Sequence, residues 1–129
     1  MSLPGLGRIS QGAVAPAPLT RNRLYQGRRT PTGCVVTVDG RPLPHLCQHS
    51  PDGFEWGYGG SGPADLALSL LTDAIGPLLA RIYYQAFKRD IVVVLSHDHW
   101  ELNRRSIIGW LEAHLIAEYG RQDERGESI

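Results

Sequence analysis

The sequence predicts an α+β fold in which an antiparallel, hairpin-rich sheet from the first half of the chain packs against three helices from the second half. Two observations lead to this prediction. Residues 34–38 contain a β-branched run that follows a turn-forming tetrapeptide, which favours a strand. From Pro63 onward, apolar residues recur at the spacing of an amphipathic helix. The Gly-rich segment 57–62 joins the two halves.

The chain length indicates one domain. A chain of 129 residues is long enough to build its own hydrophobic core. Residues 1–22 are rich in Gly, Ala and Pro and show no periodicity, so we expect a flexible leader there. We expect a single α+β domain over residues 23–120 and a polar tail over residues 121–129.

The first half contains the signals of two hairpins. Residues 24–29 and 34–38 flank the turn-forming tetrapeptide Thr30-Pro31-Thr32-Gly33, which predicts the first hairpin. Asp39-Gly40 then fits a type I′ turn. Residues 45–49 and 54–58 flank Pro51-Asp52-Gly53 and predict the second hairpin. Together these segments predict a four-stranded antiparallel meander.

The second half contains three helical segments and one further apolar run. We expect a helix from Pro63 to Gly76, a second from Pro77 to about Lys88, and a third that Asn103 caps and Gly120 ends. The run 91–95 is apolar, short and rich in β-branched residues, which predicts a further central strand. Residues 100–102 are expected to form a short partner strand.

Composition narrows the class of protein. The 13 basic and 13 acidic residues balance, so the sequence lacks the basic excess typical of nucleic-acid or membrane-surface proteins. Two cysteines are too few for a disulfide framework, and no apolar run approaches the roughly 18 residues of a membrane span. We therefore expect a cytoplasmic protein that does not contact a membrane. The oligomeric state is left open.

The stretch 49–64, with the sequence HSPDGFEWGYGGSGPA, carries a family resemblance together with Leu66-Ala67-Leu68. It resembles a bacterial family of small proteins described only as a domain of unknown function. The resemblance extends from Tyr25 to Leu102 and implies a fold without implying an activity. It also implies that an accessory or host-interaction role, as in proteins encoded by mobile elements, is conceivable. His45 and Cys47 lie outside this pattern.

The glycine-rich loop is one candidate site. It precedes a helix, so the backbone N–H groups of Gly59, Gly60, Ser61 and Gly62 could hold an anion such as phosphate. The loop lacks the Lys and Ser/Thr that complete a P-loop. We therefore expect its glycines to serve the passage from strand to helix.

Histidines and one cysteine give two further candidates. His45, Cys47 and His49 alternate, so on a strand they would share one face and offer zinc ligands, but a clear fourth ligand is missing. The turn 97–99, His-Asp-His, superficially suggests a metal-dependent hydrolase or a nuclease, although the clustered acids of such a site are absent. We expect neither a stoichiometric metal nor another cofactor.

The last candidate is a protein-binding surface. Arg28, Arg29 and Arg41 accompany Trp56 and Tyr58, and Trp, Tyr and Arg are the usual anchors of interfaces. The alternating rings of this region either lie in the core or, where exposed, contribute to such a surface. No nucleophile and base pair emerges from the sequence, so we expect a non-enzymatic protein that binds a protein partner. The alternatives are a small enzyme, or an anion- or nucleic-acid-binding domain, that uses residues 57–62 and the nearby histidines.

Overall fold

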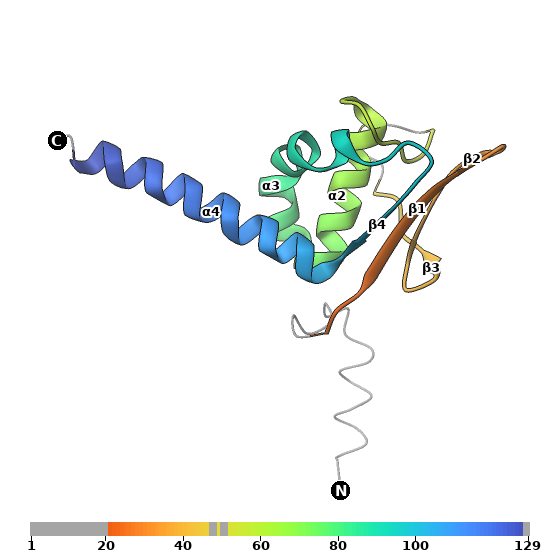
Figure 1. Ribbon diagram of the computed structural model, residues 1–129, viewed down its shortest axis with the longest axis horizontal. Helices are drawn as coiled ribbons and strands as arrows, with labels where there is room; N and C mark the ends of the chain where they lie inside the picture. The colour runs from red at the N-terminus through yellow and green to blue at the C-terminus, as the bar shows by residue number, and fades with distance from the viewer. Residues whose placement is uncertain (1–20, 47–48, 50–51, 128–129) are drawn as a thin grey trace, which may run out of the picture.

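The computed structural model describes residues 21–46, 49 and 52–127, and for residues 122–127 the backbone alone. Within these residues a sheet forms one layer and helices form the other (Figure 1). The α+β class, with the sheet formed largely by the first half and the helices packed behind it, is confirmed.

The sheet has the strand order β3-β2-β1-β4 and is antiparallel throughout. Strands β1 (Leu24–Thr30) and β2 (Gly33–Val38) form the expected first hairpin. Asp39 and Gly40 adopt the positive φ angles, 50° and 81°, that a type I′ turn requires, and they lead into the short β3 (Arg41–Pro42). The fourth strand, β4 (His99–Asn103), covers the short strand expected at 100–102, but it pairs with β1 and not with the run 91–95.

Two strand predictions are wrong. The run 91–95 forms no central strand: Val92–Val94 is the short 3₁₀ helix η1, with Val92 buried and Val94 exposed. A short apolar run cannot be assigned by periodicity alone, and here it continues directly from a helix. The second hairpin is also absent, because the described residues of 45–49 and 54–58 form no strand. The backbone N–H groups of Leu46 and His49 instead donate to the side chains of Ser69 and Asp65 on a helix.

The helices begin close to their predicted positions. Helix α2 (Ser61–Ile75) and helix α3 (Pro77–Asp90) are separated by Gly76, whose φ of 92° ends the first of them. Helix α4 (Arg104–Glu127) starts after Asn103, whose Oδ1 accepts a hydrogen bond from the N–H of Ser106 as a capping residue does. The predicted end at Gly120 is wrong, since a glycine inside a helix costs only about 1 kcal/mol and does not by itself end it.

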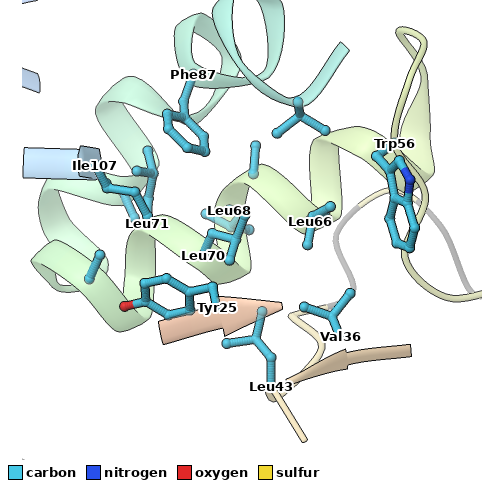
Figure 2. Packing of buried hydrophobic residues seen from close by; sticks show 14 of the residues in the cluster. Tyr25, Val36, Leu43, Trp56, Leu66, Leu68, Leu70, Leu71, Phe87 and Ile107 are labelled. Atoms are coloured by element: carbon cyan, nitrogen blue, oxygen red, sulfur yellow. The ribbon is translucent and has the colours of Figure 1, made fainter. Parts of the chain in front are cut away.

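The core lies between the inner face of the sheet and helices α2 and α3. Figure 2 shows Tyr25 and Val36 pointing from the strands toward the leucines of α2, with Phe87 above and Trp56 at one end of the cluster. Every residue of α2 from Gly62 to Leu71 is buried. Helix α2 is therefore the central element of the fold.

A polar cluster ties the start of β1 to the end of α2. The Tyr25 hydroxyl donates to Asp73 Oδ2 over 2.7 Å, and Arg23 Nη1 donates to Asp73 Oδ1 over 2.7 Å. Burial, reinforced by the Asp73 carboxylate, raises the pKa of the Tyr25 phenol well above its usual value. Buried Arg104 donates to the carbonyls of Arg21 and Asp73. The predicted leader 1–22 lies outside the described residues except for positions 21 and 22, and the Arg21 carbonyl is held in this cluster.

Candidate functional site

Strand β1 places its two arginines on opposite faces of the sheet. Successive side chains of a strand alternate, so Tyr25, Gly27 and Arg29 point toward the helices while Gln26 and Arg28 point away from them. Arg28 is exposed, whereas Arg29 is partly buried. The two residues that the sequence places side by side therefore have different roles.

Arg29 holds three separate segments together. Its Nε donates to the His97 carbonyl over 2.8 Å, and its Nη2 donates to the Trp56 carbonyl over 3.2 Å. Nη1 forms an ion pair with Glu55 over 2.8 Å, and the guanidinium carbon lies 4.9 Å from the centre of a Trp56 ring. These contacts join β1 to the loop before α2 and to the turn before β4. Arg29 is therefore part of the scaffold, and its predicted contact with a protein partner stays untested.

Cys34 lies beside this arginine. Arg29 Nη1 donates to the Cys34 Sγ over 3.2 Å, and the thiol is not in a disulfide. Burial raises the pKa of the Cys34 thiol, and the nearby Glu55 carboxylate adds to the effect against the opposing charge of Arg29. This environment favours a protonated, unreactive thiol.

The outer sheet face is the face of β1, β2 and β4 that points away from the helices. Pairing across the strands sets Val35, Arg28 and His99 in one row. The next row holds Thr37, Gln26 and Glu101, in which Gln26 Nε2 donates to Glu101 Oε2 over 2.8 Å. These side chains border a shallow hollow of about 180 Å³. Arg28 makes no side-chain hydrogen bond or ion pair within the described part of the chain, so its guanidinium is available to a ligand.

The remaining predicted interface residues lie elsewhere. Arg41 pairs with the inward-facing Val38, so its register places it on the opposite face of the sheet from Arg28. Trp56 has an exposed fraction of 0%, and its Nε1 donates to the His97 carbonyl over 2.9 Å. Tyr58 is half exposed, in the loop before α2. Trp56 is therefore closed off from solvent, and Arg41 and Arg28 lie on opposite faces of the sheet, so the structure does not bring the predicted interface residues together on one surface. Their contact with a protein partner stays an untested prediction.

Gly27 allows the backbone of β1 to pack closely against Trp100 on the inner face of the sheet, which faces the helices. A Cβ atom at this position would overlap the indole of Trp100, which stacks edge-on against Trp56 with ring centres 5.6 Å apart. The backbone of β1 therefore lies directly on a tryptophan pair. A lone glycine within a strand often marks a place where another group approaches the backbone closely, and Gly27 is such a glycine. The group that approaches it, Trp100, can be identified only once the pairing of β4 with β1 is known.

The glycine-rich loop is explained by packing. A Cβ on Gly62 would lie 2.8 Å from the Glu55 Cβ, so the start of α2 fits beneath the Glu55 side chain. A Cβ on Gly60 would come closest to the exposed ring of Tyr58, at 3.0 Å. Gly57 donates from its N–H to the Val92 carbonyl and has a φ of 86°. Anion binding by residues 59–62 stays an untested prediction, and Gly62 has a steric reason to be glycine.

The two described histidines of the predicted metal site are bonded to helix residues. His45 Nε2 lies 3.0 Å from Asp65 Oδ2, and His49 Nε2 lies 2.9 Å from the Tyr84 hydroxyl. Cys47 lies outside the described residues. Buried Asp65 also accepts the His49 N–H, so it fastens the segment before the glycine loop to α2. Among the residues that the structure describes, no three His, Cys, Asp or Glu side chains are grouped to hold a metal ion.

The turn 97–99 contributes its backbone to the scaffold. The His97 carbonyl accepts from Arg29 and Trp56, and the Asp98 carbonyl accepts from the Arg29 N–H over 2.9 Å. The exposed His97 imidazole lies 3.0 Å from Asp98 Oδ1 and holds the pKa of that carboxyl below its usual value. Of this triplet, the His99 side chain is the one that joins the outer sheet face.

Comparison with known proteins gives a family but no activity. No described helix is long and apolar enough to cross a membrane. Neither the curated proteins nor the solved structures include a match to this sequence. Residues 25–113 match a protein family, and this segment runs from the first buried residue of β1 into the first half of α4. The chain therefore belongs to the family of unknown function DUF6166.

Proposed function

We propose that this protein is a non-enzymatic binding module that recognises a protein partner through its outer sheet face. The observation that carries the proposal is the uncovered sheet, since all the described helices lie on one side of it (Figure 1). The other side bears an exposed arginine beside a hollow. A sheet face that borders solvent is ordinarily polar throughout. Here Val35 lies beside Arg28 at its centre.

The chemistry of this face suits a protein surface. Arg28 offers a planar guanidinium for carboxylates or backbone carbonyls, and arginine is enriched at interface centres. Val35 supplies apolar contact, and the Gln26 and Glu101 pair supplies polar groups at the rim. The mixture of apolar, cationic and anionic groups favours a protein over the uniformly negative backbone of a nucleic acid.

The cellular setting is part of the same proposal. We propose a cytoplasmic location, which the unpaired thiol of Cys34 supports because free thiols suit a reducing compartment. We also propose an accessory role in which the protein binds a host protein, which is supported only by the resemblance of residues 49–64 to a bacterial family.

The test compares two exposed arginines. Arg28→Ala should leave the free energy of unfolding unchanged and weaken capture of a specific protein from nuclease-treated extract, by about 1–2 kcal/mol if Arg28 is a hot spot. Arg105→Ala, which changes an exposed arginine on α4, should leave capture intact. Equal capture by wild type and Arg28→Ala would contradict the proposal. So would binding of single-stranded DNA or RNA that weakens steeply with salt, because the arginine would then serve phosphates.

A further inference from the structure

Helix α4 extends beyond the body of the molecule. Figure 1 shows its second half running away from the other elements. Its last ring contacts with α3 join Trp110 to Phe87, with centres 5.1 Å apart, and His114 to Tyr83, with centres 5.7 Å apart. Past these contacts, the described residues of α4 have no neighbouring element to cover them.

The extended part of α4 still carries an apolar stripe. Leu115, Ile116 and Tyr119 are exposed, and their spacing of three and four residues places them on one side of the helix. Glu112 lies one turn earlier on the same side. A helical segment of this length is marginal in water unless its apolar side is covered, and Gly120 weakens it further. The stripe therefore indicates a partner surface.

Helix α3 presents a matching surface. Leu78 and Ile82 have exposed fractions of 78% and 64% and lie one turn apart. Arg81 lies between them, and Lys88 and Arg89 follow in the last turn of α3. None of these three cations forms an ion pair within the residues whose side chains are described. The outer side of α3 is thus apolar at its beginning and cationic at its end.

We propose that the extended half of α4 docks antiparallel on the outer side of α3 in a second copy of this chain. In this orientation Tyr119, Ile116 and Leu115 meet Leu78 and Ile82 of the partner subunit. Glu112 then comes beside the cationic end of the partner's α3. A parallel arrangement would place Glu112 beside the single cation Arg81, between the two apolar side chains, whereas the antiparallel one places it beside both Lys88 and Arg89, so the charges favour the antiparallel one.

The charges also indicate that the helix docking on the outer side of α3 comes from a second copy of this chain. The acidic and apolar surface of α4 complements the cationic and apolar surface of α3, and both surfaces belong to one chain. In a two-fold dimer each copy offers its α4 and receives the other, so the same contact forms twice and doubles the buried area. This dimer leaves the outer sheet face free, and it is independent of the partner proposed for that face.

The experiment measures the mass of the full-length protein by sedimentation equilibrium over a wide concentration range. Wild type is expected to form a dimer, and Ile116→Glu is expected to weaken dimerisation more than about tenfold while the helical circular dichroism of the body is retained. Val94→Glu is the matched control, because Val94 is as exposed as Ile116, 73% against 72%, but lies in η1. A wild type that stays monomeric at near-millimolar concentration would overturn the proposal, as would equal weakening by the control.

A charge exchange tests the orientation. Glu112→Arg should weaken dimerisation because it faces Lys88 and Arg89 of the partner subunit, and adding Arg89→Glu to the same chain should restore it. Both substitutions change exposed positions, so the fold should be retained. Failure of the second change to restore dimerisation would contradict the antiparallel arrangement.

Discussion

Arg29 and Arg28 are adjacent in the sequence, yet the structure assigns them opposite consequences when they are replaced by alanine. Arg29→Ala removes the donors to the His97 and Trp56 carbonyls, the ion pair with Glu55 and the stacking on Trp56. Arg28→Ala removes an exposed side chain that makes no side-chain hydrogen bond or ion pair within the described residues and faces away from the helices. The first variant should therefore be destabilised and the second should not.

The magnitude follows from the individual contacts. A hydrogen bond to a charged group contributes about 1.5–3 kcal/mol. The ion pair with Glu55, which is partly exposed, adds only about 0–1 kcal/mol. The His97 carbonyl keeps its bond from the Trp56 Nε1, so part of the loss is compensated. Since contacts within one network are not additive, we expect a total loss of about 2–3 kcal/mol for Arg29→Ala.

Urea unfolding followed by tryptophan fluorescence measures the free energy of unfolding of wild type, Arg29→Ala and Arg28→Ala. For a domain of this size, each kcal/mol corresponds to roughly 4 °C in the melting temperature, so Arg29→Ala should melt about 8–12 °C below wild type. Arg28→Ala should stay within about 0.5 kcal/mol of wild type. Equal stability of the two variants would refute the assignment of Arg29 to the scaffold.

The remaining predictions concern two glycines and the Tyr25 phenol. Gly27→Ala should destabilise the protein by about 1–3 kcal/mol because its methyl group overlaps the Trp100 ring, whereas Gly109→Ala, in an open position on α4, should stabilise it by about 0.5–1 kcal/mol. Thermal unfolding decides both, and a shift of the same sign would contradict the packing described. The Tyr25 phenol should stay protonated in the folded state just above pH ~10, where a free tyrosine ionises, so the wild type and Tyr25→Phe should differ in phenolate absorbance there only after unfolding. Because the folded pKa lies above the unfolded one, this contribution to stability is complete below about pH 10 and is lost as pH rises through the folded pKa. An equal absorbance difference in the folded proteins would contradict the burial of the phenol beside Asp73.

Local sequence patterns predicted those strands and helices whose conformation depends mainly on their own residues. The β1 and β2 hairpin follows from the β-branched run 34–38 and its turns, and the starts of α3 and α4 follow from Pro77 and Asn103. The segment 91–95 was assigned wrongly because its conformation depends on contacts with α2 and α3. Local sequence does not encode such contacts.

The candidate site was predictable only in part. The sequence singled out Arg28, but the division of Arg28 from Arg29 and Arg41 depends on strand register. Val35 reads as a core residue in a β-branched strand, and the structure places it on the outer face beside Arg28. His99 lies beside Arg28 only because β4 pairs with β1, and about seventy residues of chain separate these two positions in the sequence. Long-range pairing of this kind has no signal in a single sequence.

Site-specific photo-crosslinking tests the outer sheet face most directly. A benzophenone side chain is introduced at Thr37, which borders the hollow on that face, and separately at the exposed Val94 on the helical layer. In extract of the cells that encode the protein, the account predicts a defined protein adduct from position 37 and none from position 94. Excess wild type should compete the adduct away, and excess Arg28→Ala should compete poorly. Absence of an adduct from position 37, or equal adducts from both positions, would contradict the outer sheet face as the binding surface.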